Sequence, residues 1–205
     1  ALPETIVAHG IALLGCTSTR LDRVIVAGIT NRNNSAGIRV QQSSGGGQAG
    51  RLEMYSSVLW SNTYGIWSDT SVPLAISNSV IMVSGTDAIA WRLLDTSQLT
   101  ADYNTYRVEA GGRLAELKRT ISTLNPSIAM NLYFSSLQAW QDRSGQDLNS
   151  LTQSPGFADP GSLDFGLLSE AGRWSPSGLV SDLVTSVLID AGNPSSGFSM
   201  EPSPN

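Results

Sequence analysis

The feature that most restricts the fold of this chain is an internal repeat whose period lies between 22 and 28 residues. The clearest self-match joins residues 69–71 to residues 95–97, both Asp-Thr-Ser, at an offset of 26. A second match joins 57–58 to 79–80, both Ser-Val, at an offset of 22. A third series consists of Gly-Ile or Ala-Ile pairs: Gly10-Ile11, Gly37-Ile38, Gly65-Ile66 and Ala88-Ile89. A period of this length indicates a solenoid, in which each repeat buries its apolar side chains against the next.

The repeated segments have the composition of β-strands. Residues 25–29, 52–60, 74–83 and 89–94 are rich in Val, Ile and aromatics, and Gly, Asn, Ser and Asp separate them. The leucines are too few and wrongly spaced for leucine-rich repeats, and helical-hairpin repeats are longer. One coil of a parallel β-helix, with three short strands and three turns, fits the period. We therefore predict an all-β fold, a right-handed parallel β-helix.

Asparagines recur at equivalent positions of this repeat. Asn34 and Asn62 form one such pair, and Asn78 and Asn104 form another at the offset of 26. These side chains could stack as amide ladders on neighbouring coils. Asparagine also favours turns by itself, so both interpretations stay open.

Charge excludes one class of partner. Only 14% of residues are charged, the formal net charge is −5, and Lys118 is the only lysine. Nucleic-acid binding needs a basic surface, and no Lys/Arg cluster supplies one.

No apolar run approaches the roughly 20 residues of a membrane span. The single cysteine, Cys16, excludes an intrachain disulfide.

The second half of the chain carries a set of short motifs in a specific order. They are Asp-Tyr-Asn at 102–104, Ser-Leu-Gln-Ala-Trp-Gln at 136–141, Ser-Gly-Gln-Asp-Leu-Asn-Ser at 144–150, Pro-Gly-Phe-Ala-Asp-Pro at 155–160, Asp-Phe at 164–165 and Ile-Asp-Ala-Gly at 189–192. As a set they resemble the closing module of bacterial right-handed β-helix repeat proteins of the pectin-lyase-like superfamily. The resemblance implies the β-helix fold and a location outside the bacterial cell or at its surface.

The resemblance also suggests how the chain is organised. We expect β-helix coils over residues 1–112, and closing coils with helical or loop insertions of the same solenoid over 113–205. The expected last coil is missing after residue 201, so the chain reads as a C-terminal fragment of a longer protein.

Two short helices are predicted within the closing coils. Over residues 113–124, Leu114, Leu117, Ile121 and Leu124 recur at steps of three and four residues, which indicates an amphipathic helix. A second helix is expected to begin after Ser136, the predicted N-cap. Either helix could cover the β-helix, and a partner helix on another chain is the alternative.

No catalytic constellation is predicted. His9, the only histidine, is expected in a strand or turn, and the three glycines at 45–47 read as a loop without a phosphate-binding motif. The enzymatic alternative rests on Asp69 and Asp95, which stacked coils would place about 5 Å apart, as glycoside hydrolysis requires. Arg92 is the basic residue nearest to them in the repeat. Asp-Thr-Ser is also ordinary turn chemistry.

Aromatic residues supply a third hypothesis. Trp60, Tyr64 and Trp67 lie within the repeats and could stack on sugar rings if they face outward. If Ile66 points inward, strand alternation places Trp67 outward. No cofactor is predicted, although turn aspartates are a ligand type that Ca²⁺ takes.

These observations favour a non-catalytic extracellular β-helix segment that acts as a stalk, adhesin or assembly unit. Its expected partners are polysaccharide or neighbouring copies of a surface assembly. A polysaccharide lyase or glycoside hydrolase fragment, and a carbohydrate-binding module, are the alternatives.

Overall fold

A computed structural model describes residues 8–30, 35–41, 50–121 and 128–196. The chain separates into two compact units, Ala1–Thr152 and Gln153–Asn205, and each unit is described by itself. In the described residues no helix is long and apolar enough to cross a membrane.

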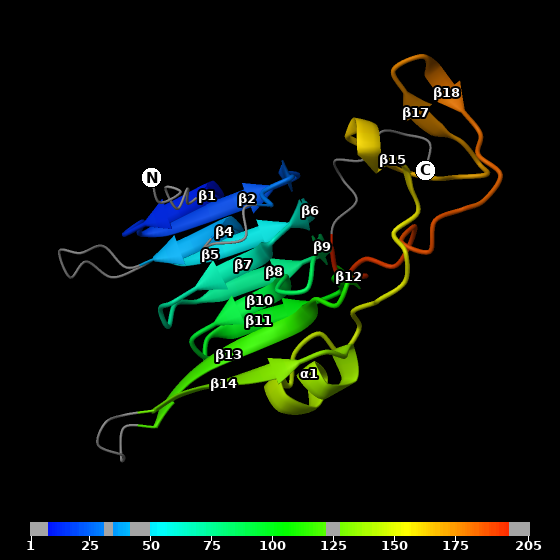
Figure 1. The fold of residues 1–205 in the computed structure, drawn as a ribbon. Coiled ribbons are helices and arrows are strands. Elements are labelled where there is room, and N and C mark those ends of the chain that lie inside the picture. Colours follow the sequence, from blue (N-terminus) through cyan, green and yellow to red (C-terminus); the bar gives the residue numbers. More distant parts are fainter. Residues whose placement is uncertain (1–7, 31–34, 42–49, 122–127, 197–205) are drawn as a thin grey trace, which may run out of the picture. The chain divides into compact units, whose positions relative to one another are not determined.

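The first unit is a parallel β-solenoid of four coils, each with three strands (Figure 1). The strands are β1 (His9–Leu14), β2 (Ser18–Asp22) and β3 (Ile25–Ala27); β4 (Ala36–Gln41), β5 (Arg51–Tyr55) and β6 (Val58–Asn62); β7 (Tyr64–Ser68), β8 (Leu74–Ser77) and β9 (Val80–Ser84); β10 (Ile89–Leu93), β11 (Leu99–Asp102) and β12 (Thr105–Glu109). Equivalent strands of successive coils pair in parallel and form three sheets. The predicted β-helix fold is confirmed.

Inward side chains form one apolar column, as the repeat predicted. Along the first sheet, Ile38, Ile66 and Trp91 occupy one register line, and all three are fully buried. Burying a large apolar side chain contributes about 1.5–3 kcal/mol, so a column of such residues dominates the stability of the solenoid.

The register corrects one detail of the predicted repeat. Ile66 pairs with Trp91 rather than with Ile89. The fourth small residue of the series that begins with Gly10, Gly37 and Gly65 is therefore Ala90 and not Ala88. A Cβ on Gly65 would lie 2.6 Å from the Ala90 carbonyl oxygen, which explains the need for a small residue. Ala88-Ile89 has the same small-then-apolar pattern, so sequence alone could not separate the two pairs.

For Asn78 and Asn104, the structure favours the turn interpretation over the amide ladder. Asn104 accepts a 3.1 Å hydrogen bond from the Ser79 backbone N–H, whereas Asn78 lies in a turn with φ of 51°. Asn62 bonds to Ile29 and to Val26 of the preceding coil, each at 3.0 Å. Asn34 lies outside the described residues, as do residues 45–47. Asparagine here anchors turns to the neighbouring coil.

The predicted helix over residues 113–124 is also wrong as far as the structure describes it. Residues Arg113–Ile121 form strand β13, which pairs in parallel with β10 and antiparallel with β14 (Ile128–Phe134). Leu114 and Leu117 are both buried in the core. Their burial explains why apolar residues occur here at the three-residue step that is typical of a helix. Pairing on both sides of β13 satisfies its backbone and overrides that local pattern.

The second predicted helix is confirmed. Helix α1 (Leu137–Ser144) begins after Ser136, whose Oγ accepts a 3.2 Å hydrogen bond from the Ala139 N–H. The helix ends at Gly145, which adopts the left-handed conformation with φ of 67°.

The C-terminal end of the solenoid is covered in all three sheets. Strand β14 reverses direction and completes the first sheet. In the second sheet, Ala101 of β11 exchanges hydrogen bonds with Asp147 and Gln146. In the third sheet, Leu151 bonds to the backbone on both sides of Thr105. The strand edges of the last coil therefore have partners from within the same unit.

A buried carboxylate holds this closure in place. Asp147 is fully buried and accepts hydrogen bonds from four side chains of the helix, the closing loop and the last coil. The donors are Trp140 Nε1 at 2.9 Å, Tyr106 Oη at 2.8 Å, Ser150 Oγ at 2.7 Å and Asn104 Nδ2 at 3.2 Å. Trp140 also stacks on Trp91, with ring centroids 6.5 Å apart, and so fills the end of the core.

The second unit is small and built from two hairpins. Strands β15 (Phe157–Asp159) and β16 (Asp164–Leu167) enclose the short 3₁₀ helix η1 (Pro160–Ser162), and β17 (Arg173–Ser175) pairs with β18 (Gly178–Val180). Arg173 joins them through ion pairs with Asp164 at 3.4 Å and Asp182 at 2.9 Å.

We predict that Asp147→Asn lowers the free energy of unfolding of the first unit by about 3 kcal/mol. The amide NH₂ would face donors where the carboxylate accepts, and a buried donor without an acceptor is costly. Asparagine tolerates the positive φ of 59° at this position, so backbone strain does not confuse the result. Urea unfolding monitored by tryptophan fluorescence provides the measurement. Asp142→Asn, an exposed change on helix α1, is the control and should have little effect.

Candidate functional site

The outer face of the first sheet carries a line of charged and aromatic side chains. Register places Arg39 of β4, Trp67 of β7, Arg92 of β10 and Glu116 of β13 side by side on successive coils. Trp67 follows the inward-facing Ile66, so its outward orientation agrees with the strand alternation expected from sequence. Because this line crosses three coils and the adjoining strand β13, it is the most concentrated chemistry on the solenoid.

Two arginines cover the faces of the Trp67 indole. The guanidinium carbon of Arg39 lies 3.6 Å from the Trp67 ring centroid, and that of Arg92 lies 4.3 Å from it. Tyr64 contacts the same ring edge-on, with centroids 5.2 Å apart. Trp67 is consequently only 6% exposed although it lies outside the core. Cation–π attraction is strongest over tryptophan, and it increases where water is excluded.

Carboxylates neutralise the stacked arginines. Asp69 accepts hydrogen bonds from Arg39, Lys118 and the Trp67 indole N–H, the last at 2.8 Å. Glu116 is 2% exposed and forms an ion pair with Arg92 at 3.1 Å. We call Arg39, Trp67, Asp69, Arg92, Glu116 and Lys118 the arginine–tryptophan cluster. Its cations and carboxylates pair with one another.

The environment of Asp69 keeps it ionised. Desolvation raises the pKa of Asp69, but hydrogen bonds from Lys118, Trp67 and Arg39, together with the charge of Arg39, outweigh it, so the pKa falls below its ordinary value. A carboxylate held in this way is a poor general acid, because it carries no proton near neutral pH.

Asp95 has different partners. Its oxygens accept 2.6 Å hydrogen bonds from the hydroxyls of Ser71 and Ser97, and the Ser97 N–H donates at 2.9 Å. Desolvation raises the pKa of Asp95, while these bonds lower it to a net value below the ordinary one. The three catalytic candidates therefore do not act on one another: Asp69 and Arg92 both contact Trp67 but have different ionic partners, and Asp95 lies outside the cluster. Asp69 pairs with Arg39 and Lys118, Asp95 bonds to serines, and Arg92 pairs with Glu116.

Of the three aromatic candidates, two lie together and one lies apart. Tyr64 and Trp67 lie in β7 of the first sheet and contact each other. Trp60 lies in β6, in the third sheet, and is half-buried. A sugar ring could reach the Trp67 indole only if Arg39 or Arg92 moved.

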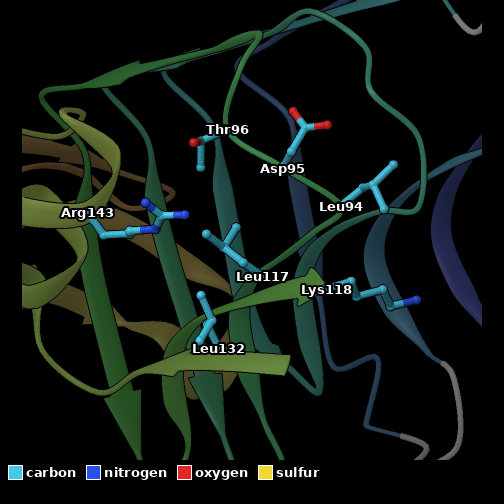
Figure 2. Close-up of a pocket in the computed structure, with 7 residues that line it drawn as sticks. All are labelled: Leu94, Asp95, Thr96, Leu117, Lys118, Leu132 and Arg143. Carbon is cyan, nitrogen blue, oxygen red and sulfur yellow. The ribbon is translucent and has the colours of Figure 1, made fainter. Parts of the chain in front are cut away.

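A pocket of about 480 Å³ opens beside the cluster. Figure 2 shows the residues that line it, which come from the turn after β10, from β13 and β14, and from α1: Leu94, Asp95, Thr96, Leu117, Lys118, Leu132 and Arg143. Arg143 extends from α1 toward Leu117, whereas the Lys118 side chain points away from Arg143 (Figure 2). The Asp95 carboxylate is directed away from Arg143, in keeping with its bonds to the serines.

Sequence reasoning missed half of this cluster. Arg39 follows the Gly37-Ile38 pair as Trp67 follows Gly65-Ile66, so the repeat contained a signal for that contact. Glu116 and Lys118 could not be placed in the cluster from sequence, because the spacing of residues 113–124 predicts a helix. His9 is the first residue of β1, as expected for a strand histidine, and its Nδ1 accepts from the Ala36 N–H at 3.3 Å.

Metal ligands do not gather in the described part of the chain. Over those residues there is no group of three or more His, Cys, Asp or Glu side chains that could hold an ion. In comparisons with known proteins, no family profile, no curated protein and no solved structure matches this sequence significantly.

We predict that Asp69→Asn destabilises the protein at neutral pH and that the difference from the wild type disappears in acid. The folded-state pKa of Asp69 is depressed, so its stabilising contribution is present above the unfolded value of about 3.9 and is lost as pH falls through the folded value. Chemical unfolding at a series of pH values measures the difference.

The control for this series is Asp87→Asn, an exposed aspartate without an ion pair among the described residues. A difference between Asp69→Asn and the wild type that stayed constant down to low pH would contradict the ion-pair account.

Proposed function

We propose that this chain is a non-catalytic β-solenoid segment of a bacterial protein located outside the cell or at its surface, where it acts as a stalk or adhesin. The resemblance of residues 101–192 to closing modules of pectin-lyase-like β-helix proteins supports the location. The coil architecture supports the mechanical role, because every coil is bonded to the next along three sheets.

The observation that carries this proposal is the internal pairing of the arginine–tryptophan cluster. Its carboxylates bind the arginines and the lysine of the cluster, and Trp67 is covered on both faces. Such a cluster ties three successive coils and strand β13 together on their outer face. It leaves neither a proton donor nor an open aromatic surface for a substrate.

The closed end of the solenoid bears on the assembly role. Unpaired strand edges promote addition of another chain. At this end β11 and β12 bond to residues 146–151, and β14 is the outermost strand of the first sheet. Two of the three sheets are therefore capped from within the first unit, which favours a stalk or adhesin role over stacking of copies through this end.

The glycoside hydrolase alternative requires one carboxyl group that is protonated at working pH and another that is ionised. The pKa values of both Asp69 and Asp95 are lowered, so neither supplies the acid. The predicted polysaccharide contact is consistent with a surface location and remains part of the proposal, without a role for these two residues.

We expect the protein to release no product from a panel of acidic and neutral polysaccharides. Reducing ends and the ultraviolet absorbance of unsaturated products measure hydrolysis and elimination separately. Asp69→Asn and Asp95→Asn proteins, prepared in parallel, should give the same baseline as the wild type. Product release by the wild type that either substitution abolishes would refute the non-catalytic role.

A further inference from the structure

Among the described residues, Arg143 is a cation of the solenoid unit that lacks an ionic partner and is directed into a cavity. Arg143 lies in the last turn of α1 and is exposed. Among the described residues it forms neither a hydrogen bond nor an ion pair through its guanidinium, in contrast to Arg39, Arg92 and Lys118. Figure 2 shows its guanidinium directed into the pocket beside the arginine–tryptophan cluster.

The other groups around this pocket do not neutralise Arg143. Asp95 is the only carboxylate in the lining, and both its oxygens accept hydrogen bonds from serines. Lys118 is paired with Asp69. The unsatisfied charge that faces the pocket is therefore positive, and an anionic ligand would complement it.

Three leucines supply the apolar part of the lining, beside four polar or charged residues. Leu117 is buried as part of the core, Leu132 is half-buried, and Leu94 is 41% exposed. The hydroxyl of Thr96, also in the lining, adds one hydrogen-bonding group. Pockets that bind small molecules combine a mainly apolar lining with a few polar groups that orient the ligand, and their volumes start at about 300 Å³.

We propose that this pocket binds a carboxylate that carries an apolar body. The carboxylate pairs with the Arg143 guanidinium, which presents two parallel N–H donors, and the apolar body rests on the leucines. A free aliphatic acid and the C-terminus of a peptide that ends in an apolar residue share this chemistry. Ligand binding of this kind adds to the proposed stalk or adhesin role and does not depend on it.

The test uses hexanoate as the probe and the leucine methyl groups as the reporters. In methyl NMR spectra, hexanoate should shift the resonances of Leu94, Leu117 and Leu132 in a saturable way. Hexylamine and hexanol, which have the same apolar chain without the carboxylate, should leave them unchanged. Shifts from all three compounds, or from none, would overturn the proposal.

Substitution of Arg143 provides the second arm. Arg143→Gln should weaken hexanoate binding about tenfold, and Arg143→Lys should weaken it less, because lysine keeps the charge but loses the paired donors. Arg107→Gln, an exposed arginine on β12, is the matched control and should bind as the wild type does. Unchanged methyl resonances elsewhere show that each variant is folded. Equal binding by Arg143→Gln and wild type would refute the assignment.

The third arm distinguishes the two sources of carboxylate. A short peptide that ends in leucine is compared with the same peptide amidated at its C-terminus. Tighter binding of the free acid than of hexanoate identifies a peptide C-terminus as the ligand, and binding of hexanoate alone identifies a small acid. Equal binding of the acid and the amide would contradict carboxylate recognition.

Discussion

Parallel pairing of each strand with its equivalent in the next coil is the constraint on which the rest of this structure depends. It sets a register in which one side chain of each coil stands above the same position of the coil below. Inward side chains therefore form an apolar column. Outward side chains form lines across neighbouring strands, and in each line the different side chains must be compatible with their neighbours. Arg39, Trp67, Arg92 and Glu116 are compatible because cations alternate with a π face and end at a carboxylate.

The same constraint creates a difficulty at the end of the solenoid, where a coil has no successor. The chain solves it with three separate devices between residues 128 and 151, namely an antiparallel strand, a hydrogen-bonding loop and a helix whose Trp140 fills the core. Asp147 links these devices through one buried carboxylate that accepts from the helix, the loop and the last coil. The Asp147 carboxylate therefore closes the end of the solenoid and also holds residues 128–151 in a single defined structure.

Much of the fold could be predicted from sequence because a repeat exposes register directly. The line from Ile11 through Ile38 to Ile66 was predictable, since each of these isoleucines follows a glycine at a position that requires a small residue. The next step failed, because Ala88-Ile89 and Ala90-Trp91 present the same pattern. Residues 113–121 failed for a different reason, since their leucine spacing fits a helix and only pairing with β10 and β14 makes them a strand. With that strand missed, Glu116 and Lys118 could not be placed in the cluster.

The central claim is that the outward aspartates are structural ions that stabilise the solenoid. The most direct measurement is an NMR titration of the side-chain carboxyl carbons of Asp69 and Asp95. Both should titrate below the ordinary aspartate value of about 3.9, as expected for carboxylates held by cations, an indole N–H and hydroxyl groups. A carboxyl that kept its proton toward neutral pH would behave as a general acid and would contradict the account.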